Sequence, residues 1–519
     1  MDLFPRDYLF AGLAVFIFWW IIDHSRHKQR YIRNVPIVGG KANLKRNRQK
    51  FVTNSLQILR TGYEENNDEL FYVPTPIGER LIIPGRYLEE LKSADMAVVD
   101  FQATFLEMFE GAYTTLGTHS RLLPQVVRAQ LNQYLPDVLP EIQCEIRDSV
   151  TELFPPCQDW TVINVTELMA VLVARVSSRM FGGPALSQNR EWIEASLRFA
   201  HDGFNAAQKL KMWPDTLKFI GQHFIPEVRS IKNTYKIAER AIIPLLDVRS
   251  IKNTYKIAER AIIPLLDERE VDKSKKAHDL LTWMYDQAQG AEKDKKFIAG
   301  TLLKVSFAAY HTSAAAPTQL LFDIAAMPEH IAPLLGEYLS APRDNNQNIS
   351  VKGFAQMVKL DSIMKESQRF NPLLLLTFER IIKRDFTLSD GVVIPANTWI
   401  GCAAQAIGMD RKLYPDPDTF DAFRFVAKEE ATATSTSVPA TKAHYTSANP
   451  GSMAFGYGQH ACPGRFFAMM EIKAIIGEIL SRFEMRLADG EMRPPSVTFE
   501  TQHLPHPAGK VLFKRRRCT

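Results

Sequence analysis

A single cysteine, Cys462, lies in the segment AFGYGQHACPGRFF (residues 454–467), among glycines, a proline and a histidine. Four kinds of chemistry suit it: a structural disulfide, a zinc site, a nucleophilic thiol and a thiolate ligand of haem iron. The five cysteines of the chain are too few and too irregularly spaced for a disulfide framework. No C-x-x-C motif and no pair of histidines accompany Cys462, which disfavours zinc. The last two alternatives stay open at this point.

The residues around Cys462 suit a thiolate that binds haem iron. Such a ligand needs glycines that let the backbone approach the porphyrin, and hydrogen-bond donors near the sulfur. It also gains from the start of a helix behind it, because the helix dipole favours the anionic sulfur. Gly456, Gly458 and Gly464 meet the first need. The run RFFAMMEIKAIIGEIL (465–480) predicts the helix.

Two further segments carry polar residues at positions that could do chemistry. Glu366 and Arg369, in KESQRFNP, are three residues apart and share one face of a predicted helix. By itself this pair is weak evidence for a functional site, because such pairs are common on helix surfaces. The segment SFAAYHTSAAAP (306–317) places His311 and Thr312 in a long apolar helix.

Taken together, these segments resemble the cytochrome P-450 monooxygenases, whose haem-binding loop has the pattern F-x-x-G-x-x-x-C-x-G. Phe455, Gly458, Cys462 and Gly464 occupy its four fixed positions. The resemblance implies that Cys462 is the axial ligand of haem b (iron protoporphyrin IX). A thiolate there pushes electron density toward the iron and favours O–O cleavage.

The resemblance also assigns roles to the other polar residues. In this family the E-x-x-R pair is buried behind the haem and joins a later arginine, here Arg424 in DTFDAFRF. Glu366, Arg369 and Arg424 are therefore expected to form a buried triad. Thr312 holds the position of the family's threonine, whose hydroxyl passes protons to bound oxygen. His311 replaces the usual acid, which leaves open whether it delivers protons or is a hydrogen-bonded core residue.

Cations are expected beside the two haem propionates. His460, Arg380 and Arg128 lie where the family places such groups, although each also suits an ordinary charged surface position, and the family's tryptophan has no clear counterpart. The segment NPLLLLTF (371–378) places Leu374–Thr377 where the wall of a substrate pocket is expected. Its apolar character predicts a lipophilic substrate, unless these residues are simply core.

The amino terminus predicts a membrane anchor over residues 1–26. The run YLFAGLAVFIFWWII (8–22) is uncharged and close to the length of a membrane span, and basic residues follow it. A cleaved signal peptide is the alternative, but its charge would precede the apolar run and a small-residue cleavage site would end it. We expect an endoplasmic-reticulum membrane protein whose catalytic domain faces the cytosol.

Residues 27–519 are expected to form one large domain with the cytochrome P-450 fold, mainly α with a minor β lobe. Apolar residues recur at helical spacing through 101–340. Three segments have strand character: FYVPTPIGERLIIPGRYL, GVVIPANTWIGCAA and LPHPAGKVLF. Residues 427–449 read as a low-complexity surface loop.

A tandem duplication interrupts this pattern: VRSIKNTYKIAERAIIPLLD occurs at 228–247 and again unchanged at 248–267. One helix through both copies would add about 30 Å and turn everything downstream by roughly 200°. The central helix, expected from near residue 295, could not then keep its place. One copy is therefore predicted to loop out, with the helix breaking at Pro244.

These expectations combine into a haem-thiolate monooxygenase that uses O2 and electrons from a membrane-bound NADPH–cytochrome reductase. The histidine–threonine pair and the segments KLDSIMKESQRF and HACPGRFFA resemble fungal specialised-metabolism members, which implies a terpenoid or meroterpenoid substrate. Two alternatives remain: a reductase-independent isomerase or dehydratase, and a non-catalytic haem-binding protein on the membrane. The net charge of +5 gives no argument for a nucleic-acid partner.

Overall fold

The computed structural model describes residues 30–517, except 67, 118–119, 121, 259–277 and 427–443, and omits the side chains of 244 and 247–258. The predicted anchor (1–26) and most of the predicted loop at 427–449 therefore lie outside the described residues. Within the part that is described, no helix combines the length and the apolar character needed to cross a membrane.

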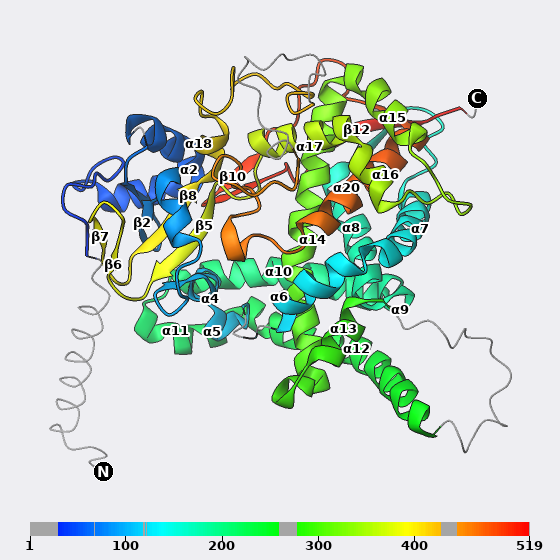
Figure 1. Ribbon diagram of the computed structural model, residues 1–519, viewed down its shortest axis with the longest axis horizontal. Helices are drawn as coiled ribbons and strands as arrows, with labels where there is room; N and C mark the ends of the chain where they lie inside the picture. The colour runs from blue at the N-terminus through cyan, green and yellow to red at the C-terminus, as the bar shows by residue number, and fades with distance from the viewer. Residues whose placement is uncertain are drawn as a thin grey trace, which may run out of the picture.

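A small β lobe lies at one side of the molecule, on the left in Figure 1. Its main sheet has the strand order β1-β2-β8-β5-β3, with β2 parallel to β8 and the other neighbours antiparallel. The strands are β1 (Phe71–Thr75), β2 (Gly78–Ile82), β3 (Val99–Asp100), β5 (Leu376–Ile382) and β8 (Trp399–Ala403). β-branched and aromatic residues fill these strands, and all seven residues of β5 are buried. The strand predictions for FYVPTPIGERLI and TWIGCA are confirmed.

Three smaller sheets complete the β structure. A three-stranded sheet has the order β4-β12-β9, and β10–β11 and β6–β7 are two-stranded hairpins. Their bounds are β4 (Thr161–Asn164), β6 (Phe386–Thr387), β7 (Val393–Ile394), β9 (Phe483–Arg486), β10 (Val497–Phe499), β11 (Gln502–Leu504) and β12 (Lys510–Arg515).

Helices form most of the rest of the described chain, as the sequence predicts. The longer ones are α2 (Leu44–Asn66), α4 (Phe101–Met108), α7 (Leu135–Leu153), α8 (Val165–Gly182), α10 (Arg190–Lys211), α12 (Pro226–Ala258), α13 (Leu280–Gln287), α14 (Lys295–Ala326), α15 (Ile331–Ser340), α17 (Val358–Phe370) and α20 (Arg465–Arg482). Short helices are α3 (Leu88–Leu91), α5 (Gly111–Thr114), α6 (Leu122–Val126), α9 (Pro184–Ser187), α11 (Lys218–Gly221), α16 (Val351–Gln356) and α18 (Ala404–Gly408).

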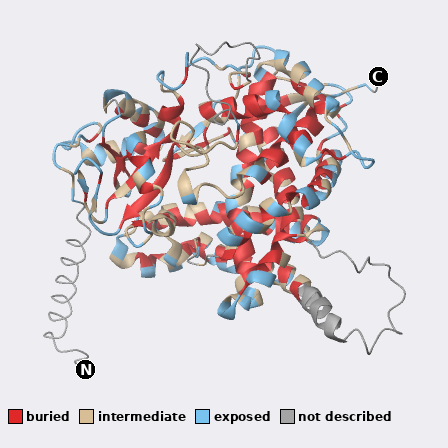
Figure 2. Cartoon of the chain, in the orientation of Figure 1, coloured by how far each residue is buried: buried red, intermediate tan, exposed pale blue. Residues whose placement is uncertain are grey.

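Helix α14 is the axis of the helical part and contacts α8, α10, α12 and α20 (Figure 1). It begins where the sequence predicts, because the Asp294 side chain accepts a hydrogen bond from the Lys296 N–H and caps the first turn. Apolar residues surround it almost completely, which is the pattern of a helix inside a core. Figure 2 shows it mostly buried.

The predicted break of the duplicated helix at Pro244 is wrong. α12 runs without interruption from Pro226 to Ala258 and so passes into the second copy. A proline inside a helix removes one backbone hydrogen bond and costs about 3 kcal/mol, which packing elsewhere along the helix can offset. The first copy supplies that packing, since Ile231, Ala238 and Ile242 are buried in the main core.

Candidate active site

The loop before α20 presents Cys462 in a tight, glycine-dependent conformation. The Cys462 N–H donates to the Phe455 carbonyl at 2.9 Å, which closes the turn on itself. Gly456 and Gly458 have φ angles of +72° and +73°, a region that other residues rarely adopt. A Cβ on Gly458 would lie 2.6 Å from the Lys92 Cβ, so this position excludes any side chain.

The surroundings of the Cys462 sulfur include groups that favour the thiolate. Burial raises the pKa of Cys462, while a backbone hydrogen bond from Gly464 and the charge and N–H of Arg465 act in the opposite direction. Those N–H groups belong to the beginning of α20, where the helix dipole favours an anion. Cys462 is a free, half-buried thiol, and a Cβ on Gly464 would meet no protein atom within 4 Å. Protein atoms therefore leave the loop accessible on the side of Gly464.

An open face on α14 lies in the same region, since α14 and α20 are in contact (Figure 1). Ala308 and Thr312 are the exposed residues between Ile298 and Ala325, and they are one turn apart. Two exposed positions on one side of an otherwise buried helix define a surface that protein atoms leave accessible. The Thr312 hydroxyl donates to the Ala308 carbonyl at 2.8 Å, which leaves its oxygen lone pairs directed outward.

His311 is held differently from its neighbour Thr312. Its ring packs edge-on against Phe204 and Phe307, with centroid distances of 6.3 and 6.5 Å. Burial, followed by the nearby His201, lowers the pKa of His311 to about 4, so the imidazole is neutral at pH 7. Its Nε2 is buried and has no hydrogen-bond partner among the described residues.

Glu471, on α20, is a buried acid that the sequence analysis did not single out. Its side chain accepts a hydrogen bond from the Ser177 hydroxyl at 3.0 Å. Burial raises its pKa to about 8, and hydrogen bonds from Ser177 and Ser313 lower it only in part. The carboxyl is therefore mostly protonated at pH 7, beside the residue that follows Thr312. Two charged residues, Glu471 and Lys473, inside the apolar run FFAMMEIKAII were the available signal.

The three predicted propionate partners lie together around Phe101. The His460 ring stacks on the Phe101 ring at 5.1 Å, and the Arg380 guanidinium lies 4.8 Å from it. Arg128 donates to the Gln459 carbonyl at 2.7 Å, one residue before His460. Burial, then the charges of Arg380 and Arg128, lower the pKa of His460 to about 4.

The carboxylate near this cluster is Asp100, which caps α4 and partly opposes the lowering of the His460 pKa. Neither Arg128 nor Arg380 forms an ion pair with any carboxylate in the described part of the chain. Arg380 is 3% exposed, and burial lowers its pKa to about 10. The Nε2 of His460 and the Nε of Arg465 are buried without hydrogen-bond partners. Such a donor set suits a ligand that carries two carboxylates and lies against the Cys462 loop, as haem does.

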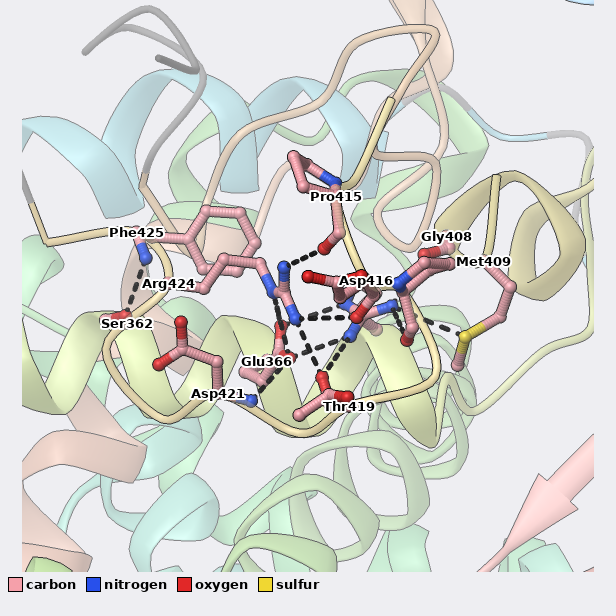
Figure 3. Close-up of polar contacts among 12 residues, drawn as sticks. Ser362, Glu366, Gly408, Met409, Pro415, Asp416, Thr419, Asp421, Arg424 and Phe425 are labelled. Carbon is pink, nitrogen blue, oxygen red and sulfur yellow. Dashed lines mark hydrogen bonds and ion pairs between the residues drawn. The ribbon is translucent and has the colours of Figure 1, made fainter. Parts of the chain in front are cut away.

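Glu366, Arg369 and Arg424 meet in a buried cluster (Figure 3). Arg369 binds the Glu366 carboxylate through two nitrogens at 2.7 and 2.8 Å, and the Arg424 Nε binds it at 3.1 Å. The two guanidiniums also donate to backbone carbonyls of Gly408, Pro415, Asp416, Pro417 and Thr419. The cluster therefore ties α17 to the irregular segment that leads toward the Cys462 loop.

The residues of the predicted pocket wall, Leu374–Thr377, do not all lie in the same environment. Leu375 and Leu376 are fully buried in a core cluster with Phe51 and Phe71, so they follow the core alternative. Leu374 is half-buried and bridges to Gln502 on the β10–β11 hairpin.

Comparison with known proteins identifies the family. The family model described as "Cytochrome P450" matches residues 164–513, more than half of the chain. The chain belongs to the cytochrome P450 family. It is 33% identical over 490 residues to the cytochrome P450 monooxygenase braC of Annulohypoxylon truncatum, covering 93% of both chains. The predicted family and fold are therefore confirmed.

Other fungal relatives of this P450 extend the comparison. The cytochrome P450 monooxygenase paxP of Penicillium paxilli is 32% identical over 472 residues, covering 90% of this chain and 87% of its own. An ent-kaurene oxidase of Gibberella fujikuroi is 30% identical over 492 residues, covering 93% and 92%. The protein is thus a P450 monooxygenase of the fungal specialised-metabolism type, a family that holds haem through a cysteine thiolate and uses O2, a redox partner and a small-molecule substrate.

Proposed function

We propose that this P450 oxidises a lipophilic fungal secondary metabolite, such as a terpenoid or meroterpenoid, with electrons from an NADPH–cytochrome reductase. The observation that carries the proposal is the pairing of the Cys462 loop with the open Ala308–Thr312 face of α14. A row of aromatic rings, Phe109, Phe204 and Phe307, borders this face and suits an apolar skeleton. The name of the ent-kaurene oxidase relative, which denotes a diterpene hydrocarbon, supports this class.

In this proposal the chain binds haem b through Cys462, with the backbone N–H groups at the start of α20 stabilising the thiolate. Arg128, Arg380 and His460 bind the propionates, which gives the two unpaired arginines their anions. The bound haem supplies oxygen activation, and the thiolate favours O–O cleavage. Phe455 and Gly458 keep the loop closed around Cys462.

Proton delivery falls to residues near Thr312. The Thr312 oxygen faces the open side of α14 and orients a proton donor there. Glu471 holds a proton on its carboxyl at neutral pH and is hydrogen-bonded by Ser313, the residue after Thr312, so it is a proton store on the α20 side of that position. His311 stays neutral and acts through packing rather than as the missing acid.

The experiment uses purified full-length protein in detergent with an NADPH–cytochrome reductase and ent-kaurene as the probe hydrocarbon. We expect NADPH and O2 consumption together with an oxygenated product. Turnover of substrate without reductase would favour the isomerase or dehydratase alternative. A haem spectrum without any NADPH consumption, across a panel of terpenoids, would favour the non-catalytic alternative.

The location is part of the same proposal: residues 1–26 anchor the protein in the endoplasmic-reticulum membrane and the catalytic domain faces the cytosol. Its support is the apolar run at 8–22 with basic residues after it. A chain lacking 1–26 should leave the membrane fraction while keeping its haem. Retention of that variant in membranes would contradict an anchor at this terminus.

A further inference from the structure

Tyr445 is a buried aromatic residue in the irregular segment that leads to the Cys462 loop. It is 2% exposed and belongs to the main core cluster. Its ring lies edge-on to the ring of Phe455, with a centroid distance of 5.3 Å and an interplanar angle of 90°. Phe455 is the residue whose carbonyl accepts the Cys462 N–H at 2.9 Å. One aromatic side chain therefore connects Tyr445 to the residue that holds the backbone of Cys462.

The Tyr445 phenol is also close enough to Cys462 for an electrostatic interaction. Burial raises the pKa of Tyr445, and the negative charges of Asp361 and Cys462 raise it further. The phenol is therefore neutral at pH 7. Its hydroxyl donates no hydrogen bond to another described residue, so the edge-on contact with Phe455 is its connection to the loop.

A buried ion pair between α17 and α20 fixes the backbone of Tyr445. The Tyr445 N–H donates to the Asp361 carboxylate at 2.7 Å, and the Lys473 Nζ binds the same carboxylate at 2.8 Å. Lys473 is 1% exposed and also donates to the carbonyls of Phe354 and Met357. All three hydrogens of its ammonium group thus have acceptors. Moving any member of this cluster would leave a buried charge without its partner, which is costly.

The other end of the same peptide group is held by a second lysine. The Lys365 Nζ, on α17, donates to the His444 carbonyl at 3.0 Å, and Lys365 is 3% exposed. The His444 carbonyl and the Tyr445 N–H belong to one peptide, which lies in no helix or strand. Side chains therefore supply the two hydrogen bonds that a helix or sheet would supply elsewhere.

We propose that Tyr445 is a positioning residue for the Cys462 thiolate: its ring holds Phe455, and Phe455 in turn holds the Cys462 N–H. The buried charges on α17 and α20 keep Tyr445 in place. The position of the sulfur is then set by these two helices as well as by the glycines of its own loop. This inference goes beyond the proposed function, because it concerns the loop of the haem ligand and is independent of the substrate.

The test compares Tyr445→Leu with Tyr445→Phe in the full-length haem-loaded protein. Amide hydrogen exchange of the peptide covering 455–464 reports on the hydrogen bond from Cys462 to Phe455. The carbon monoxide difference spectrum reports on the fraction of haem that is bound by a thiolate. Tyr445→Leu should speed the exchange about two- to tenfold, the factor expected for the loss of one aromatic pair, and should reduce the red-shifted band. Tyr445→Phe keeps the ring and should match the wild type in both measurements.

The double variant Asp361→Leu/Lys473→Met tests the support of Tyr445. It replaces the ion pair by apolar side chains, so that neither charge is left buried alone. It should also speed the exchange of the loop. Adding Tyr445→Leu to it should have a smaller effect than Tyr445→Leu has in the wild type, because both changes act through one contact. Fully additive effects would show that the ion pair does not act through Tyr445 and would overturn that part of the inference.

Phe154→Leu is the matched control, since Phe154 makes a similar edge-on contact with Phe513 at 5.4 Å and neither residue belongs to the Cys462 loop. It should lower the urea midpoint without changing the exchange of the loop or the carbon monoxide band. Wild-type exchange in Tyr445→Leu, or the same defect in Tyr445→Phe or in Phe154→Leu, would overturn the inference. The red-shifted band of the wild-type protein reports separately on Cys462 as the haem ligand.

Discussion

Replacement of Gly458 by alanine tests the geometry of the Cys462 loop quantitatively. A non-glycine residue in the left-handed region costs about 1–2 kcal/mol. The new Cβ would also lie 2.6 Å from the Lys92 Cβ and 3.2 Å from the Lys92 carbonyl oxygen. Forcing such an atom into a packed site typically costs about 1–3 kcal/mol more. Gly458→Ala should therefore lower the free energy of unfolding by about 2–5 kcal/mol.

Gly456→Ala is the matched control, because Gly456 has nearly the same φ but its Cβ would meet no atom closer than 3.8 Å. It should show only the conformational cost of about 1–2 kcal/mol. Urea titrations of the haem-loaded proteins, followed by Soret absorbance and circular dichroism, give the two midpoints. Equal midpoints for the two variants would refute the steric role of Lys92.

Gly464→Ala separates folding from haem binding at the same loop. Gly464 has no strained φ, and its Cβ would meet no protein atom within 4 Å. The apoprotein should therefore unfold at the wild-type urea concentration. The added methyl group lies on the open side of the loop, so the variant should hold less haem per protein. Wild-type haem content would show that this side of the loop does not face the cofactor.

Four other changes address the chemistry and the duplication. Cys462→Ser should abolish the red-shifted band of the reduced carbon monoxide complex; survival of the band would move the thiolate ligand to another cysteine. Thr312→Ala should increase peroxide release per NADPH while product falls, and unchanged coupling would place proton delivery elsewhere. Glu471→Gln should flatten the pH dependence of stability. Because the pKa of Glu471 is about 8 in the folded protein and lower in the unfolded chain, the wild type loses stability as the pH rises from the unfolded pKa toward 8. The melting temperature of the wild type should therefore fall between pH 5.5 and 8 more than that of the variant. Deleting 248–267 should leave haem content unchanged, since the first copy is packed in the core, and loss of haem would make the second copy part of the fold.

Local patterns in the sequence predicted the parts of the structure that depend on local rules. The start of α14 near residue 295, the strand runs and the glycine turn before α20 all follow from short-range geometry. The break at Pro244 was wrong because a proline's local cost was outweighed by packing that only the tertiary structure contains. The run FFAMMEIKAII signals that Glu471 is unusual, but its contacts with Ser177 and Ser313 depend on helices distant in sequence.

The residues of the candidate site also fall into those that the sequence predicts and those that only the tertiary structure brings together. The four positions of the Cys462 loop are identifiable from their match to the family's haem-loop pattern. The grouping of Arg128, Arg380 and His460 around Phe101 instead requires four separate segments to meet. The neutral state of His311 likewise depends on burial against Phe204, which no pattern within 306–317 reveals.

The buried triad of Glu366, Arg369 and Arg424 also affects the order in which parts of the molecule unfold. Glu366 and Arg369 are one helical turn apart, so their contact forms with α17 itself, but Arg424 reaches Glu366 from 58 residues away. The guanidiniums hold the irregular segment at 415–419 through its backbone carbonyls, and this segment belongs to no helix or sheet. Such a segment opens at lower free energy than the core, in the manner of a sub-global unfolding unit seen by hydrogen exchange. Its amide protons should therefore exchange before those of α14, and haem should escape through that opening while most of the helices remain folded.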